Sequence, residues 1–345
     1  MKNIYNMTIE ELEEYFLNNN EKKFKALQTY SWIYEKRIKS FDEMTDMKKS
    51  LIEKIKEDFK LDYLKIVKVE RDKEVNKYLF ELEDGTHIES VLMKHDYGKS
   101  ICISSQVGCN MGCKFCESGR LKKVRDLNAY EMVLQILEVE KDINERISHV
   151  VIMGIGEPFD NYTNVTNFIK IINHPKGLAI GSRHITVSTS GLVPKILEFA
   201  DFPYQVNLAI SLHAPNNKIR DKIMPINKAY KIEELINSLK TYYKKTNRRL
   251  TFEYIMLDGI NDSDECAEEL CELLKGINCY VNLIPYNETN NIEFKRSKKD
   301  RISKFYDIIK KNNVGVTIRR EFGTNISAAC GQLRSKKEEL WNHFI

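Results

Sequence analysis

Three cysteines lie close enough together in this 345-residue chain to hold a metal centre. They are Cys109, Cys113 and Cys116, in a segment that reads CNMGCKFC. Thiolates are preferred ligands of iron–sulfur clusters and of zinc. Zinc knuckles use paired CxxC motifs or mixed cysteine–histidine sets, and the sequence has no second pair. Three thiolates on a four-iron cluster would leave one iron open to a substrate or cofactor, so we expect a [4Fe–4S] cluster.

Five cysteines lie outside this segment. Cys266, Cys271 and Cys279 have no metal-binding spacing, and we expect them in the core. Cys102 lies in an apolar stretch seven residues before the first cluster cysteine, and Cys330 follows two alanines. By residue type alone, Cys102 fits a buried strand and Cys330 fits a small-residue packing site.

Composition limits the class of protein. The chain is 42% hydrophobic and 30% charged, with 15 Gly and 7 Pro, which is typical of a globular protein and excludes collagen-like or disordered chains. Its net charge of +4 permits a nucleic-acid partner through local patches without requiring one. No apolar run approaches the ~20 residues that a membrane helix needs. The first residues carry acids where a signal peptide would be apolar, so we expect a cytoplasmic protein.

Hydrophobic periodicity divides the chain into four parts. We predict a helical accessory domain at 1–62, a β-hairpin linker region at 63–94, a core at 95–335 and a charged tail at 336–345. The accessory domain has no glycine, and Thr8 followed by Glu10 and Glu11 is a good helix start. Asp84-Gly85 between alternating segments is a strong hairpin signal.

The core alternates between strand and helix patterns. Predicted strands lie at 100–104, 149–153, 183–188, 205–212, 250–256, 280–284 and 315–318, and predicted helices at 130–141, 232–243, 264–274 and 298–311. This alternation predicts an α/β fold with a parallel sheet and helices outside it, open or closed into a barrel. Ligands in such folds bind at the C-terminal ends of the strands. The thiol segment directly follows the first predicted strand.

The CxxxCxxC spacing resembles that of the radical S-adenosylmethionine (SAM) superfamily. Residues 154–158 (GIGEP) end the strand at 149–153 and are similar to the superfamily's "GGEP" segment beside the SAM amino group. The resemblance implies a partial (β/α)6 barrel whose [4Fe–4S] cluster holds SAM at the open iron. Reductive cleavage of SAM there would yield a 5′-deoxyadenosyl radical.

A closer resemblance is to the RlmN/Cfr family of RNA adenosine methyltransferases. It is carried in order by CISSQVGC at 102–109, RHITVSTSG at 183–191, SLHAP at 211–215, MPIN at 224–227, NLIPYN at 282–287 and AACGQL at 328–333. With the segment around Trp32 and Tyr34, the similarity covers nearly the whole chain. It implies methylation of an adenosine in 23S ribosomal RNA at the peptidyl transferase centre, and of an adenosine beside the anticodon in transfer RNA.

The resemblance assigns a methyl relay to two cysteines. C2 of adenine is not nucleophilic, so direct polar transfer from SAM would fail there. In the family, one thiolate first accepts a methyl group, which requires a deprotonated cysteine. Matched by motif, Cys330 is that S-methylcysteine and Cys102 the resolving residue that forms a transient disulfide with it. Glu89 matches the family's proton acceptor, although a hairpin glutamate is ordinarily solvent-facing.

Further residues match the family's SAM contacts. They are Gly156, Glu157, Ser188, Ser211, Leu212, His213 and Asn287. The basic runs 120–125 and 319–320 could contact RNA phosphates or be ordinary solvated surface. The chain departs from the expected pattern at Glu117-Ser118 and at 325–327, which leaves the ligand and relay cysteines intact.

Alternatives remain open at this stage. The GEP segment and the VSTSG segment at 187–191 favour C2 methylation over Cfr-type methylation of C8, which gives antibiotic resistance. A non-catalytic, metal-containing RNA-binding protein would not need Cys102, Cys330 and Glu89, and the basic runs weigh against a small-molecule substrate. We further expect an electron donor such as flavodoxin or ferredoxin, no membrane partner, and a monomer.

Overall fold

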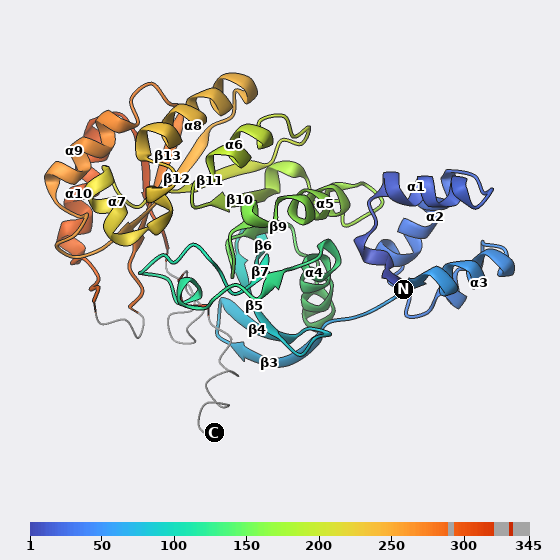
Figure 1. Ribbon diagram of the computed structural model, residues 1–345. Coiled ribbons are helices and arrows are strands. Elements are labelled where there is room, and N and C mark those ends of the chain that lie inside the picture. The colour runs from blue at the N-terminus through green and yellow to red at the C-terminus, as the bar shows by residue number, and fades with distance from the viewer. Residues whose placement is uncertain (289–292, 321–330, 334–345) are drawn as a thin grey trace.

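The computed structural model describes residues 1–288, 293–320 and 331–333 and has a helical module beside a curved sheet (Figure 1). The module consists of α1 (Ile9–Asn18), α2 (Phe24–Tyr30) and α3 (Lys49–Asp58). Thr8 caps α1 in a capping box with Glu11, which confirms the predicted start. The second helix continues past Tyr30 as a π-helical turn, Ser31–Glu35, that buries Trp32.

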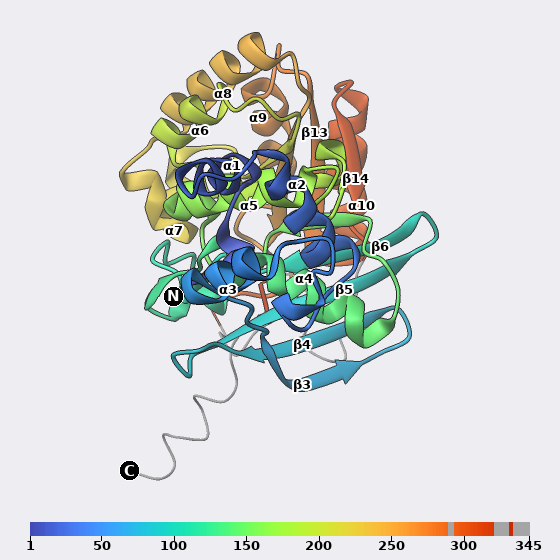
Figure 2. The ribbon, with the colours of Figure 1, turned by 90° about the vertical axis from the view of Figure 1, so that its right-hand side faces the viewer.

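The module packs against the first two helices of the core, α4 (Ala129–Ile143) and α5 (Tyr162–Asn173), as Figure 2 shows. Asn6 accepts a hydrogen bond from the backbone of Tyr130 in α4 at 3.2 Å. Arg37 pairs with Glu140 of α4 at 2.5 Å, and the ring of Tyr30 contacts that of His174 just after α5. Buried side chains of the module belong to the same apolar cluster as those of the core.

Ten strands form one sheet among the described residues, in the order β14-β13-β12-β11-β10-β9-β6-β5-β4-β3. Three strands form the antiparallel part: β3 (Lys65–Arg71), β4 (Val75–Glu81) and β5 (His87–His95). This part joins the core sheet because β5 pairs antiparallel with β6. From β6 to β14 along this sheet, seven strands pair in parallel with one another. They are β6 (Gly98–Ile103), β9 (His149–Ile152), β10 (Ile185–Thr189), β11 (Asn207–Ser211), β12 (Leu250–Met256), β13 (Cys279–Pro285) and β14 (Gly315–Ile318).

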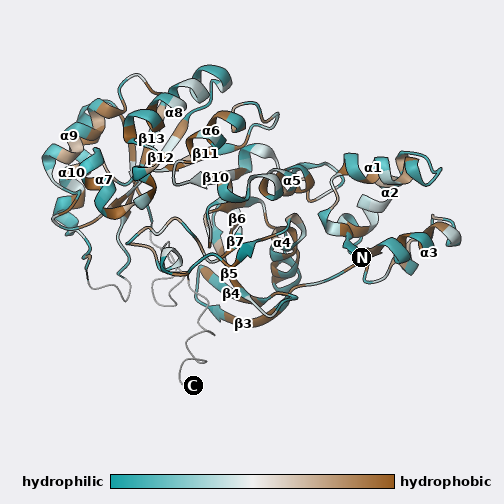
Figure 3. Ribbon diagram, in the orientation of Figure 1, coloured by the Kyte–Doolittle hydropathy of each residue, from teal (hydrophilic) through white to brown (hydrophobic). Residues whose placement is uncertain are grey.

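Helices cover the outer face of the parallel strands (Figure 1). They are α4, α5, α6 (Val193–Phe199), α7 (Asn217–Ile223), α8 (Ile232–Thr246), α9 (Asp264–Leu273) and α10 (Lys299–Lys311). The described chain thus forms six strand–helix units and a last strand, which confirms the partial (β/α)6 barrel. Figure 3 shows apolar residues along the strands and polar residues on the exposed helix faces.

Alternation along the strands separates the core from the concave face. In β6, Ile101 and Ile103 are fully buried in the main apolar cluster, while Ser100 and Cys102 have the opposite orientation. Cys266 is buried in the core, and Cys271 and Cys279 pack against it, as predicted. The cysteines of the described residues are all free thiols. None of the described helices is both long and apolar enough to cross a membrane.

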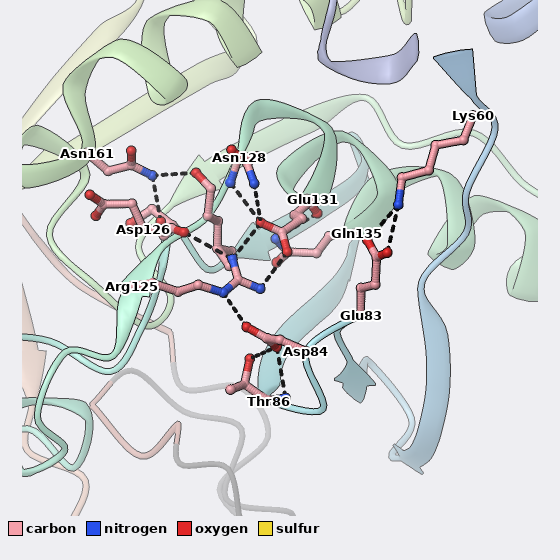
Figure 4. Close-up of polar contacts among 12 residues, drawn as sticks. Lys60, Glu83, Asp84, Thr86, Arg125, Asp126, Asn128, Glu131, Gln135 and Asn161 are labelled. Atoms are coloured by element: carbon pink, nitrogen blue, oxygen red, sulfur yellow. Dashed lines mark hydrogen bonds and ion pairs between the residues drawn. The ribbon is translucent and has the colours of Figure 1, made fainter. Parts of the chain in front are cut away.

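A polar junction fixes the hairpin tip to the core (Figure 4). Arg125, in β8 (Arg125–Asp126), donates to Asp84 at the hairpin turn at 2.5 Å and to both carboxylate oxygens of Glu131 in α4 at 2.8 and 2.9 Å. Lys123 pairs with Asp126 and Asp160 at 2.8 and 2.9 Å. These cations of the 120–125 run therefore stabilise the fold, which favours the structural interpretation over phosphate binding.

Candidate functional site: a thiol pocket at the C-terminal ends of the strands

The cysteine loop is held in place by bonds to three other segments. It follows β7 (Gln106–Val107), which pairs with β8, and the Cys109 N–H donates to Leu121 O at 3.0 Å. Lys114 N donates to Ile223 O at the end of α7. Phe115 is buried among apolar residues that include Ile223 and Met224. These contacts fix the loop against β8 and α7.

The GIGEP segment places one carboxylate in the site. Gly156 has φ +109°, and a Cβ there would lie 2.6 Å from Cβ of Gln106, so only glycine fits. Glu157 is buried, and its two carboxylate oxygens accept from the N–H groups of Phe159 at 3.0 Å and Ser190 at 2.7 Å. Burial raises the pKa of Glu157, and these hydrogen bonds oppose the rise.

His213 is held in a strained turn after β11. Its backbone has φ +58°, which is uncommon outside glycine, and its carbonyl accepts from the side chain of Asn261 at 2.8 Å. The ring Nδ1 accepts from Ile255 N–H at 3.1 Å, which leaves the proton of the neutral ring on Nε2. Burial, helped by the charge of Arg220, lowers the pKa of His213 to about 3. The ring is thus a neutral donor.

These elements enclose a cavity of about 140 Å³, which we call the thiol pocket. Its lining includes the predicted ligands and several predicted SAM contacts: Cys109, Cys113, Cys116, Gly156, Glu157, Ser188, Ser211 and His213. Two predicted contacts, Leu212 and Asn287, do not line it. Leu212 points into the apolar core, and the side-chain oxygen of Asn287 is buried with no partner among the described residues.

The three thiols suit a cluster better than a single ion. Within the described chain, no group of three or more His, Cys, Asp or Glu residues is arranged to hold one metal ion. Burial raises the pKa of Cys109 to about 12 and that of Cys113 well above its usual range. A metal centre converts such thiols to thiolates. Three half-buried thiols that line one pocket therefore match the ligand set of a multi-iron cluster.

Glu89 and Cys102 lie beside the pocket on the concave face of the sheet. Val91 in β5 pairs with Cys102 in β6, and Glu89 lies two residues before Val91, so all three share one face. Glu89 is 3% exposed, and its carboxylate lies 3.7 Å from the Lys77 ammonium. Glu89 is thus buried, whereas a hairpin glutamate is ordinarily solvent-facing.

Leu333 links this face to the thiol pocket. It lines the pocket, and it packs in an apolar cluster with Val91 against which Cys102 also packs. Its carbonyl accepts from Ser118 Oγ at 2.9 Å, and Gly331 O accepts from Glu117 N–H at 2.9 Å. Cys330 lies outside the described residues, but the residue that follows it is bonded to the chain directly after the cluster cysteines.

Two buried charged residues were not predicted. Arg220 in α7 is fully buried and donates to the carbonyls of Leu212, Ser190 and Ser211 and to Asn227. Glu253 in β12 is 6% exposed and lines the thiol pocket. Glu253 could have been found from the sequence, because it is a charged residue within the apolar strand sequence LTFEYIM. The sequence around Arg220 gives no comparable indication that this residue is buried.

Comparisons with known proteins agree with this geometry. The radical SAM superfamily model matches residues 103–274, and the "Ribosomal RNA large subunit methyltransferase N-terminal domain" model matches residues 2–61. A curated relative from Enterococcus faecalis, "Probable dual-specificity RNA methyltransferase RlmN", is 55% identical and covers 99% of each chain. The chain belongs to the RlmN family of radical-SAM methyltransferases. It is therefore an enzyme.

Other RlmN relatives and a solved structure extend the match. The similarly named protein of Caldanaerobacter subterraneus is 53% identical over 97% of this chain and 98% of its own. The crystal structure of a radical SAM methyltransferase from Sphaerobacter thermophilus superposes with a TM-score of 0.90 at 41% identity, covering 97% of this chain and 100% of that one. RlmN-family membership thus extends over the N-terminal module as well as the barrel.

Proposed function

We propose that this enzyme methylates C2 of an adenosine in 23S ribosomal RNA and of an adenosine beside the anticodon in transfer RNA. The relatives named dual-specificity RNA methyltransferase support RNA as the substrate. The observation that carries the proposal is that Leu333 lines the pocket of the three thiols and also packs on the sheet face that holds Glu89 and Cys102.

The thiol pocket would hold the cofactors. Cys109, Cys113 and Cys116 would ligate a [4Fe–4S] cluster, which with SAM bound supplies the 5′-deoxyadenosyl radical. Glu157 presents a buried carboxylate for a cationic amino group, and His213 presents a neutral N–H donor. Ser188 and Ser211 line the same pocket and add hydroxyls. The side-chain oxygen of Asn287 has hydrogen-bonding capacity to spare, and Leu212 would contribute through its backbone.

Cys330 and Cys102 would carry the methyl group and release the product. Cys330 would accept a methyl group at its sulfur, and hydrogen abstraction from that group would leave a carbon radical able to add to C2. The adduct radical would return one electron to the oxidised cluster, and its C2 proton would pass to Glu89. The Cys102 thiolate would then attack the Cys330 sulfur, so that a disulfide forms as the S–C bond breaks and the released carbon takes up a proton to complete the methyl group. The packing of Leu333, three residues after Cys330, on the surface around Cys102 supports this pairing.

Glu89 would accept the proton that leaves C2. Its position on the same face as Cys102 supports the assignment, since a base must lie within hydrogen-bonding reach of its proton. Lys77 places a positive charge 3.7 Å from the carboxylate. An electron donor such as flavodoxin or ferredoxin, a cytoplasmic location and a monomeric state complete the proposal.

Mass spectrometry of nucleosides tests the proposed function. Ribosomal and transfer RNA from a strain lacking the gene should gain 2-methyladenosine after treatment with the reconstituted enzyme, SAM and a reductant. A Cys330→Ala variant should yield none, with Cys271→Ala as the matched control. Formation of 8-methyladenosine would instead establish the Cfr-type reaction, and a colourless zinc protein without SAM cleavage would establish the non-catalytic alternative.

A further inference from the structure

A second and larger cavity opens at the opposite end of the same strands. It measures about 1130 Å³, and we call it the basal cavity. Its rim comes from residues just before or at the start of the parallel strands: Tyr97 before β6, His149 in β9, Arg183 and His184 before β10, and Arg248 and Arg249 before β12. Arg183, His184 and Asn282 belong to motifs of the family resemblance, but the roles that the resemblance assigns do not account for this cavity.

The basal cavity is cationic. Five arginines line it, against two carboxylates, those of Asp96 and Glu253. Within the described chain, Arg183, Arg248 and Arg249 form no ion pair. Their contacts are neutral: Arg183 donates to Gln205 at 3.3 Å, Arg248 donates to Asn207 at 3.1 Å, and Arg249 lies 5.3 Å from the ring centroid of Tyr280. These positive charges therefore remain available to a polyanion.

Four aromatic rings follow one another along the rim. His95 stacks on Tyr97 with centroids 4.6 Å apart, Tyr97 meets His149 edge-on at 5.2 Å, and His149 stacks on His184 at 4.2 Å. Tyr97 is 67% exposed. Ser100 and Ser148 hydrogen-bond the rings of His95 and His149 at 2.9 and 2.8 Å. Exposed ring faces among arginines are the usual platform for unpaired bases.

The basal cavity leads to the thiol pocket. Met153, Glu253 and Arg319 line both. The strand register places Ser211, Glu253 and Asn282 side by side on β11, β12 and β13, and Asn282 donates to Glu253 at 2.9 Å. A side-chain amide reads the N6/N7 edge of adenine, and a carboxylate can accept from an exocyclic amino group. The inner end of the basal cavity therefore offers base-reading groups next to the predicted SAM contact Ser211.

We propose that a single-stranded RNA segment enters the barrel through the basal cavity. Its flanking bases stack on the ring row of His95, Tyr97, His149 and His184, and its phosphates bind Arg183, Arg248 and Arg249. The target adenosine reaches Glu253 and Asn282 from the side opposite the cysteine loop. This inference rests on the proposed function and adds the route and the residues of RNA recognition. The ring row and the inward path favour RNA over a protein partner, which would need neither.

RNA affinity of the full-length, anaerobically reconstituted protein tests the route. The probe is a fluorescent stem-loop with an unpaired adenosine in its loop, measured by anisotropy at several salt concentrations. The double variant Y97A/H149A should bind about 25-fold more weakly or worse, because each base–ring stack contributes roughly 5- to 160-fold in affinity. R183Q/R249Q should lower the salt slope by about 1.4, the value for two phosphate contacts to a single strand.

Matched variants elsewhere serve as controls. Y63A removes an exposed tyrosine near the N-terminal module, and K195Q/K275Q removes two lysines on the helical exterior; both should bind RNA as the wild type does. Wild-type affinity, within twofold, in both basal-cavity variants would overturn the route. So would slower cluster reduction by flavodoxin in R183Q/R249Q at unchanged RNA affinity, since that result assigns the arginines to an acidic protein.

The same preparations separate this inference from the proposed function. If the wild type binds the stem-loop through the basal cavity but forms no methyladenosine, the function fails and the route stands. If RNA is methylated normally and the basal-cavity variants are indistinguishable from the wild type in affinity, the function stands and the route fails.

Discussion

The cavities at the two ends of the barrel strands differ in volume and in the charge of the residues that line them. The thiol pocket at the C-terminal ends measures about 140 Å³ and is lined by three half-buried cysteines and by the buried side chains of Glu157 and His213. The basal cavity at the N-terminal ends measures about 1130 Å³ and is lined by exposed arginines and rings. The comparison shows that one set of strands has a small pocket fixed by backbone hydrogen bonds at one end and a larger, cationic cavity at the other.

The largest expected effect is at the thiol pocket. Cys113→Ala should reduce bound iron from about four atoms per chain to below one, because a cluster needs all three thiolates. Iron analysis and the visible absorption spectrum measure this directly. Cys271→Ala, outside the pocket, should retain iron at the wild-type level. Full iron loading of the Cys113 variant would show that this end does not hold the cluster.

A second large effect concerns the support of the pocket. Arg220→Gln should destabilise the fold by about 3 kcal/mol, because buried carbonyls of Leu212, Ser190 and Ser211 would lose their donor. Thermal unfolding measures the change. Arg301→Gln, which breaks the surface pair with Asp264, should shift the melting temperature by no more than about 2 °C. Equal shifts in the two variants would contradict a special role for the buried arginine.

The buried imidazole predicts a pH dependence. Burial lowers the pKa of His213 to about 3. Below about pH 6.5 the ring is therefore protonated in the unfolded chain but stays neutral in the folded chain. The stability that His213 contributes relative to His213→Gln should therefore be smaller at pH 5.5 than at pH 7 by about 1.3 kcal/mol. Denaturant unfolding of both proteins at the two pH values checks this. A pH-independent difference would mean that folding leaves the pKa of the His213 ring at its unfolded value.

The smallest effect should be at the basal cavity. Tyr97→Ala removes an exposed ring, so the melting temperature should stay within about 2 °C of the wild type and bound iron should not change. Differential scanning calorimetry and iron analysis provide the comparison. Loss of iron on this substitution would mean that the two ends are not separate in function.

Local patterns were sufficient to predict most elements. The strand predicted at 250–256 is observed as Leu250–Met256, and the cap at Thr8 is present with its predicted acidic first turn. These features depend on neighbours within one or two turns of chain, where periodicity and capping chemistry are decisive. The pairing of β5 with β6 was not predicted, because hydrogen bonds across a sheet depend on segments that only folding brings together.

The sequence by itself determined the chemistry: three cysteines at CxxxCxxC spacing, a GEP segment and a family whose motifs run along the chain. Only the tertiary structure decided that Glu89 and Cys102 share one face of the sheet and that Glu253 lines both cavities. It also decided that Arg125 pairs with Asp84 and Glu131 and so joins the hairpin to the core. The physical reason is that ligand spacing is local, whereas burial, charge pairing and register arise from contacts between residues far apart in the chain.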